Sequence, residues 1–277
     1  MAQVRRCAVL GSPIGHSLSP VLHRAAYAAL DLGWSYDAVE VTEEGLPGFL
    51  DGLGTEWRGL SLTMPLKRTV VPLVDEVLPQ AARAGGGNTV LLDGGRRLLD
   101  NTDVPGAAAA LRERYDGPVG SALVLGGGAT AASVLLALAD LGCREATLAV
   151  RDPARAEETL AAVARHPGGL EVRVVRLTDP LPEADVLVST VPAAAQEDAL
   201  LERLPRTAVV FEVLYDPWPT PLARWAGATG RVLVGGLDLL VHQAVLQVAA
   251  MTGQVVDVAV LRRAGEEALA AREARAQ

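Results

Sequence analysis

The stretch ALVLGGGATAASVLLALADLG, residues 122–142, decides the expected fold. Four apolar residues suited to a strand lead into three glycines, and an Ala- and Leu-rich run suited to a helix follows. Gly126, Gly128 and Ala131 have the G-x-G-x-x-A spacing of a dinucleotide-binding turn, where amides at a helix N-terminus face a pyrophosphate. We predict a cofactor loop formed by Gly126, Gly127, Gly128, Ala129 and Thr130. A tight turn without a ligand is the alternative.

The segment LAVRDPARAE, residues 148–157, bears on the choice of cofactor. It follows the turn's helix and ends the next expected strand, where an acidic residue favours NAD and arginine favours NADP. Arg151 and Arg155 stand one helical turn apart, a spacing at which two guanidinium groups can hold a phosphate. Asp152 is expected to cap the following helix. We therefore predict NADP.

Strand-like and helix-like segments alternate on both sides of this turn, which predicts the α/β class. We expect an N-terminal α/β domain over residues 1–104 and a Rossmann-type doubly wound domain over 105–237. Residues 238–277 are expected to form two helices, about 238–251 and 256–275, that pack back onto the first domain. The expected strands are 6–10, 35–41, 59–62, 90–92, 96–99, 122–125, 146–150, 171–175, 186–189, 208–213 and 232–234.

Composition excludes several classes of function. The net charge of −8 over 277 residues argues against nucleic-acid binding, and two cysteines are too few for a disulfide framework. Residues 117–139 lack charge, but the central glycines favour a strand and helix over a membrane span. The N-terminus does not resemble a signal peptide. We expect a cytoplasmic protein with a small-molecule ligand, as a monomer or homodimer.

Lys67 is the only lysine, since the other 24 of the 25 basic residues are arginine. Isoleucine occurs once and asparagine twice, as a G/C-rich coding bias would produce. Under such a bias a surface lysine drifts to arginine, whereas a lysine that must exchange a proton cannot, because guanidinium stays charged. Lys67 is therefore a candidate acid/base; a chance survivor is the alternative.

Other polar residues cluster in short motifs. Ser17 and Ser19 stand at the expected start of a helix, with Ser19 as N-cap and Pro20 as the first helical residue. Two hydroxyls at a helix N-terminus also suit a carboxylate. Both asparagines, Asn88 and Asn101, precede a threonine. Asp103 is either the N-cap of a helix over 104–114 or a functional carboxylate.

Seven motifs together resemble the shikimate dehydrogenase family, in order and over nearly the whole chain. The motifs are GSPIGHSLSP (11–20), LTMPLK (62–67), GNT (87–89), NTDVPG (101–106), GGGAT (126–130), YDPWPTPL (215–222) and GLDLLVHQ (236–243).

The resemblance implies NADP-linked interconversion of 3-dehydroshikimate and shikimate in aromatic amino-acid biosynthesis. It implies an N-terminal substrate domain and a Rossmann cofactor domain. Lys67 and Asp103 would flank the reacting C3 oxygen, and Gly236 would contact the cofactor. The implied substrate-binding residues are Ser17, Ser19, Thr63, Asn88, Asp103, Tyr215 and Gln243.

The chain departs from the family at several positions. Ser61 stands where asparagine is frequent, so we expect that contact to be lost or bridged by water. Glu212 stands where aspartate is common, and Asp238 where a glycine near the nicotinamide is usual. Val150 and Ala129 replace an asparagine and a loop glycine.

Three rivals stay open. A quinate dehydrogenase, linked to NAD or NADP, shares the fold. Methylenetetrahydrofolate dehydrogenase shares the two-domain plan and a catalytic lysine, but not the Asn-Thr and Ser-x-Ser motifs. A non-catalytic NADP-binding sensor would bind cofactor without turnover. The four histidines, His16, His23, His166 and His242, lack metal-ligand spacing, and no metal is expected.

Overall fold

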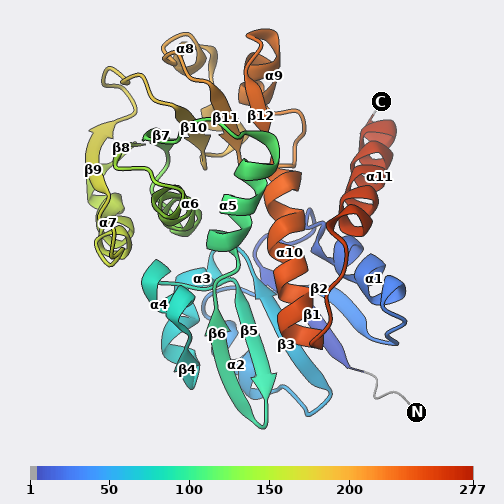
Figure 1. Cartoon of the computed structure of the whole chain (residues 1–277). Coiled ribbons are helices and arrows are strands. Elements are labelled where there is room, and N and C mark those ends of the chain that lie inside the picture. Colours follow the sequence, from blue (N-terminus) through green and yellow to red (C-terminus); the bar gives the residue numbers. More distant parts are fainter. Residues whose placement is uncertain (1–4, 277) are drawn as a thin grey trace. The chain divides into compact units, whose positions relative to one another are not determined.

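The structure is a computed structural model that describes residues 5–276, except for the side chains of Arg155 and Ala276. The chain divides into two compact units. One unit runs up to Thr102 and resumes at Leu240, and the other is Asp103–Leu239. Each unit contains a six-stranded sheet, which confirms the α/β class (Figure 1).

The first unit has a mixed sheet with the strand order β2-β1-β3-β5-β6-β4. Strands β1, β2 and β3 are parallel, whereas β5 runs antiparallel to both β3 and β6. The strands are β1 (Arg6–Gly11), β2 (Ser35–Glu40), β3 (Trp57–Leu62), β4 (Glu76–Val77), β5 (Thr89–Asp93) and β6 (Arg96–Asp100). The helices are α1 (Ser19–Ala29), α2 (Leu46–Asp51), α3 (Leu66–Thr69), η1 (Val71–Leu73), α4 (Pro79–Ala84), α10 (Gly236–Thr252, from Leu240 onward) and α11 (Val258–Ala276).

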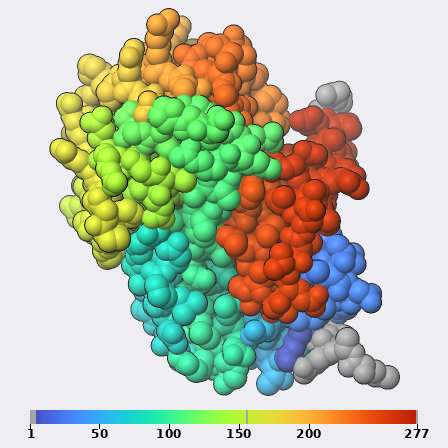
Figure 2. Space-filling view, in the orientation of Figure 1, coloured from blue at the N-terminus to red at the C-terminus, as the bar shows by residue number. Residues whose placement is uncertain are grey.

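Strand β1 is buried on both faces of this sheet. Its alternate residues point to opposite sides, so Ala8 and Leu10 join one apolar cluster while Cys7 and Val9 join another. The second cluster also takes in Met251 of α10, and α11 packs on α1. The space-filling view accordingly shows the red C-terminal residues beside the blue N-terminal ones (Figure 2). The two C-terminal helices thus form part of the first unit.

Strands β5 and β6 form a tight hairpin. Asp93 pairs with Arg96, which leaves a two-residue loop. Both loop residues, Gly94 and Gly95, have positive φ, at 57° and 82°. A two-residue loop of this kind matches the right-handed twist of the flanking strands, and glycine adopts it without strain.

The second unit is a Rossmann-type parallel sheet with the order β12-β11-β10-β7-β8-β9. Helices α6 and α7 pack against each other, and α5 packs against α6 (Figure 1). The strands are β7 (Ser121–Leu125), β8 (Glu145–Val150), β9 (Glu171–Arg176), β10 (Val186–Ser189), β11 (Val209–Glu212) and β12 (Val232–Val234). The helices are α5 (Asp103–Arg114), α6 (Ala129–Asp140), η2 (Pro153–Ala156), α7 (Glu157–Val163), η3 (Ala193–Ala195), α8 (Asp198–Leu201) and α9 (Pro221–Ala228).

The predicted cap of the first helix is wrong by one position. Helix α1 begins at Ser19 itself, and the residue before it is Leu18, which has no side chain able to cap. The backbone N–H of Ser19 instead bonds to Ser17 Oγ at 3.3 Å. The error arises because two hydroxyls stand two residues apart, and either can accept from the first turn.

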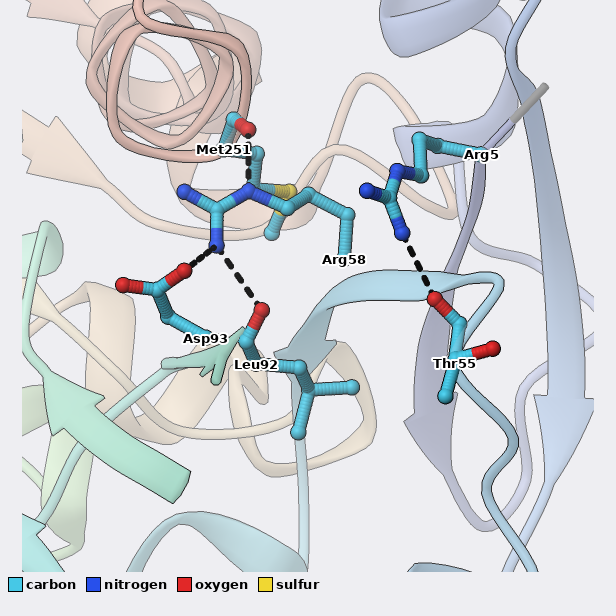
Figure 3. Close-up of polar contacts among 6 residues, drawn as sticks. All are labelled: Arg5, Thr55, Arg58, Leu92, Asp93 and Met251. Carbon is cyan, nitrogen blue, oxygen red and sulfur yellow. Dashed lines mark hydrogen bonds and ion pairs between the residues drawn. The ribbon is translucent and has the colours of Figure 1, made fainter. Parts of the chain in front are cut away.

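Arg58 on β3 connects three elements of the first unit (Figure 3). Its Nε donates to the carbonyl of Met251 in the last turn of α10 at 3.0 Å. Its Nη1 donates to the Leu92 carbonyl on β5 at 2.8 Å and more weakly to Asp93 at 3.4 Å. A guanidinium at a helix C-terminus satisfies a carbonyl that has no partner within the helix and favours the helix dipole.

We predict that Arg58→Ala lowers the free energy of unfolding by about 2 kcal/mol, because charged hydrogen bonds to half-buried carbonyls are lost. Urea denaturation measures the change. Arg96→Ala is the matched control, since Arg96 pairs with Glu76 where both side chains are exposed, at 59% and 43%. Such surface pairs contribute under about 1 kcal/mol. Equal losses for both variants would contradict the capping role.

Candidate functional site

Loops of the first unit meet at the carboxyl ends of β1 and β3. Gly11, at the end of β1, packs so closely on the next loop that a Cβ there would overlap the Thr63 side chain. The backbone N–H of Gly87 donates to the Lys67 carbonyl at 2.9 Å. A Cβ at Gly86 would lie 2.7 Å from the same carbonyl oxygen. Glycine at these positions therefore lets the loops that carry Thr63 and Lys67 approach the Asn88 segment.

Asn88 is the centre of a buried polar cluster. Its Nδ2 donates to Thr102 Oγ1 at 2.9 Å and to Gln243 Oε1 at 3.1 Å. Its Oδ1 accepts from the Thr102 backbone N–H at 2.8 Å. Asn88 and Gln243 are 3% and 5% exposed. The structure thus brings together two predicted substrate-binding residues that are 155 positions apart.

Gln247, one turn after Gln243 on α10, extends this cluster across the sheet. Its Nε2 donates to the Asn88 carbonyl at 3.1 Å and to Thr89 Oγ1 at 3.0 Å. Its Oε1 accepts from Ser61 Oγ at 2.9 Å. Thr89 Oγ1 in turn donates to Asn88 Oδ1 at 3.0 Å. Gln247 thereby fixes which side of the Asn88 amide faces Gln243.

Ser61 is buried, 4% exposed, and has protein partners on both sides. It accepts from the Tyr36 hydroxyl at 2.6 Å and donates to Gln247. The shorter side chain expected to lose a contact is thus part of a hydrogen-bonded chain between β2, β3 and α10.

His23 closes the same network from α1. Its ring stacks on Tyr36 with centroids 3.9 Å apart, and its Nε2 lies 3.2 Å from Gln247 Oε1. Burial lowers the pKa of His23 to about 3, so the ring is neutral and Nε2 carries the hydrogen. Its Nδ1 is buried without a hydrogen-bond partner. His23 therefore acts as a donor and packing group. In the described part of the chain, no three His, Cys, Asp or Glu side chains group around a possible metal position.

Ser17 and Ser19 lie together at the start of α1. Ser19 is buried, whereas Ser17 is half-buried and uses only an acceptor site in its bond to Ser19 N–H. The Ser17 hydroxyl keeps its hydrogen available to a ligand. Arg272 of α11 donates to the His16 carbonyl at 2.8 Å, which ties the C-terminal helix to this loop.

Gly126 and Gly128 shape the turn between β7 and α6. Gly126 has a φ of +100°, and a Cβ there would overlap the Thr190 hydroxyl, so glycine is required. Gly128 precedes the first helical residue, and a Cβ there would meet nothing within 4 Å. That space leaves the backbone open to a ligand. Thr159 Oγ1 holds the turn by donating to the Gly127 carbonyl at 2.7 Å.

Arg151 directly follows β8 and is exposed. The expected cap by Asp152 is confirmed, because its carboxylate accepts from Ala154 N–H at 3.2 Å. The Asp152 carboxylate at this strand end is thus hydrogen-bonded to the start of the following helix. The side chain of Arg155 lies outside the described residues.

Tyr215 is half-buried in the loop after β11, and this loop packs on Gly236, where a Cβ would overlap the Leu214 carbonyl. Asp238 is buried in the first turn of α10. It accepts from Gly235 N–H at 2.9 Å and from Arg114 at 2.8 Å. The first contact is the carboxylate half of a capping box. Asp238 therefore caps its own helix and pairs with α5.

Lys67 is half-buried in α3, and Asp103 is the buried first residue of α5. The two residues belong to different units, and their pairing stays a prediction.

A cleft of about 480 Å³ lies elsewhere in the first unit and contains none of the predicted site residues. Arginines line it, but Arg5 donates to the Thr55 carbonyl and Arg58 to those of Leu92 and Met251 (Figure 3). These guanidinium groups hold the ends of chain segments. The cleft is therefore not the candidate site.

Sequence reasoning missed Gln247, Tyr36 and His23. Gln243 and Gln247 stand four residues apart, so they share one face of a helix. Two buried glutamines on an otherwise apolar helix face need hydrogen-bond partners. Their four-residue spacing was therefore the sequence signal that could have revealed the polar cluster.

The second unit defines a dinucleotide-binding protein of the Rossmann type, joined to a unit with its own polar cluster. The sequence of residues 9–90 matches the shikimate dehydrogenase substrate binding domain. A shikimate dehydrogenase (NADP(+)) from Synechocystis is 33% identical over 92% of this chain and 93% of that protein. The chain belongs to the shikimate dehydrogenase family.

Solved structures agree with this assignment. The Mycobacterium tuberculosis shikimate dehydrogenase is 38% identical with a TM-score of 0.86, over 95% of this chain and 99% of that one. The Thermus thermophilus enzyme in complex with NADP(H) and shikimate is 35% identical with a TM-score of 0.82, over 96% and 100%.

A quinate dehydrogenase from Corynebacterium glutamicum in complex with NAD is also similar, at 27% identity and a TM-score of 0.86, over 95% of this chain and 99% of that one. Among residues 5–276, no helix combines the length and apolar character needed to cross a membrane.

Proposed function

We propose that this chain catalyses the reversible, NADP-linked reduction of 3-dehydroshikimate to shikimate. The observation that carries the proposal is the buried Asn88–Thr102–Gln243 cluster beside the loop of Lys67, in a chain of this family. A polyhydroxylated ring needs several fixed donors and acceptors, and such a site rejects analogues that leave its polar groups unpaired.

The predicted N-terminal domain, residues 1–104 with 238–277, would bind the substrate, and the predicted Rossmann domain, residues 105–237, would bind NADP. Ser17 and Ser19 would hold the carboxylate. Contacts to the ring hydroxyls or the carboxylate would come from Thr63, Asn88, Asp103, Tyr215 and Gln243. We place the enzyme in the cytoplasm, as a monomer or homodimer acting on small molecules.

The second unit fits a dinucleotide. The open space at Gly128, the left-handed Gly126 and the exposed Arg151 are what a pyrophosphate and a 2′-phosphate need. The residues that would hold NADP are Gly126–Thr130, Arg151, Arg155 and Gly236. The bound cofactor supplies a hydride to the substrate ketone.

Lys67 would act as the acid/base at the reacting oxygen. Reduction of a ketone builds negative charge on that oxygen, so a positioned ammonium stabilises it and donates a proton. In the reverse direction the neutral amine takes the hydroxyl proton. Asp103 would orient the amine.

Purified protein with shikimate or quinate, and NADP or NAD, tests the proposal at the nicotinamide absorbance. The highest kcat/KM is expected for shikimate with NADP. A preference for quinate with NAD would favour the second candidate, which the similarity to the Corynebacterium glutamicum enzyme supports. Cofactor binding without turnover would leave only a sensor role.

We predict that Ser17→Ala raises the KM for shikimate roughly tenfold, because one charge-assisted hydrogen bond to the carboxylate is worth about 1.4 kcal/mol or more. Steady-state kinetics and melting temperature are measured together. Ser12→Ala is the control from the same loop, since Ser12 bonds to Glu40 at 3.1 Å. A lower melting temperature with unchanged KM would show that Ser17 only supports the helix start.

We predict that replacing Arg151 and Arg155 together by alanine weakens NADP binding far more than NAD binding, because only NADP carries the 2′-phosphate. Titration calorimetry with each cofactor measures both constants. Arg173→Ala, exposed in the same unit, is the control for overall charge. Equal weakening of both cofactors would remove the assignment.

We predict that Lys67→Arg folds and binds both ligands but loses about 10²–10⁴-fold in turnover, because guanidinium does not release a proton near neutral pH. Lys67→Ala should show a similar rate. Binding is followed by calorimetry, and Arg68→Lys serves as the neighbouring control. If Lys67→Arg keeps turnover within roughly threefold, a change under about 0.7 kcal/mol in barrier, Lys67 is only a positive charge.

A further inference from the structure

The loop from Val213 to Thr220 joins β11 to α9 and carries Tyr215. It packs directly on the start of α10. A Cβ at Gly236 would overlap the Leu214 carbonyl, and a Cβ at Gly235 would lie 3.1 Å from the Trp218 ring. The loop therefore determines where Tyr215 stands relative to Gly236 within the second unit.

Glu212, the last residue of β11, anchors this loop at both ends. It is fully buried, 0% exposed. Its Oε1 accepts from Leu214 N–H at 3.0 Å, near the start of the loop. Its Oε2 accepts from Thr220 Oγ1 at 3.0 Å, at the end of the loop, and from Gln196 Nε2 at 2.6 Å.

Each partner of Glu212 can only donate a hydrogen bond to it. Gln196 Oε1 accepts from Leu222 N–H at 3.0 Å, which fixes the amide so that its nitrogen faces Glu212. Thr220 Oγ1 accepts from Ala223 N–H at 3.0 Å as the cap of α9, so its own hydrogen points to the carboxylate. A backbone N–H can only donate. The site therefore matches a carboxylate, and a proton on Glu212 would face donors.

We propose that Glu212 is a positioning residue that holds the Val213–Thr220 loop in its working arrangement only as a carboxylate, so that falling pH releases Tyr215. The proposal rests on the proposed function for the role of Tyr215, but the ordering of the loop is independent of turnover. The glutamate side chain reaches both ends of the loop, at Leu214 and at Thr220.

The electrostatics of the site put the transition near neutral pH. Burial raises the pKa of Glu212 to about 7 from 4.5, and the hydrogen bonds from its partners offset part of that rise. The groups that face it are the Val213 and Leu214 amides, Gln196 from the segment after β10, and Thr220 from the start of α9. None of these titrates or carries charge.

The ionisation of Glu212 affects the free energy of unfolding and the order of the loop in opposite directions. Between pH 4.5 and about 7 the folded protein keeps the Glu212 proton, whereas the unfolded chain has released it. This carboxyl therefore makes the free energy of unfolding fall as pH rises through that window. As pH rises through this window, the loop becomes ordered while the free energy of unfolding falls. The two measurements therefore separate a positioning role of Glu212 from a purely stabilising one.

Trp218 reports on the loop without requiring activity. The full-length protein is labelled with 5-fluorotryptophan, and Trp218→Phe assigns its ¹⁹F resonance among the four tryptophans. We expect the Trp218 resonance to shift with a midpoint near pH 7, while the resonance of Trp57 in the first unit stays constant. Glu212→Gln should keep Trp218 at its low-pH position throughout, and the exposed control Glu171→Gln should titrate like the wild type.

A Trp218 resonance that does not move across about two pH units on either side of 7 would overturn the proposal, as would an unchanged titration in Glu212→Gln. The wild-type titration needs no variant. Thr220→Val removes one donor to the charged form and should move the midpoint upward. If the loop titrates but the KM for shikimate does not follow the same midpoint, the loop does not position the substrate. Absence of any turnover would reject the proposed function and leave the loop result standing.

Discussion

The first unit depends on the hydrogen bonds of one buried glutamine. Gln247 supplies two donors and accepts twice, and its partners come from α1, β3 and the start of β5. In a low-dielectric interior an unpaired polar group is costly, so the network is held in the arrangement that pairs Gln247 with Asn88, Thr89 and Ser61, although His23 Nδ1 stays without a partner. The order of donors and acceptors is thereby set along the chain: Gln247 donates to Thr89, Thr89 donates to Asn88, and Asn88 donates to Gln243. The side chains proposed to bind substrate are thus oriented by the core of the sheet.

Arginine and lysine occupy different kinds of position in this chain. Arg58 and Arg97 each donate to carbonyls in the last turn of a helix, and Arg114 pairs with the buried Asp238. A planar group with five donors suits carbonyls that lie in different directions. These three arginines therefore connect the ends of helices to neighbouring segments. The one lysine lies in the short helix α3 beside the Asn88 segment.

The periodic and glycine-based features of the fold could be predicted from the sequence. The two-residue hairpin, the parallel Rossmann sheet and the glycine turn follow from local backbone preferences that neighbouring residues specify. The start of α1 was predicted one residue too late, because Ser17 and Ser19 can both accept a hydrogen bond from the first turn. The contacts of Ser61 with Gln247, of Asp238 with Arg114 and of Glu212 with Gln196 could not be predicted, because each joins residues that only the folded chain brings together. Ser61 and Gln247, for example, are 186 positions apart.

The division of the first unit into two chain segments sets the order in which a nascent chain can complete it. When the chain has been synthesised as far as Thr102, the segments of β1 to β6 are present, but Asn88, Thr89 and Ser61 still lack their glutamine partners on α10. The second unit is continuous and can fold as soon as it emerges. The N-terminal sheet must then wait for α10 before its polar interior is satisfied. The N-terminal segment of the first unit is in this way made before the second unit but completed after it.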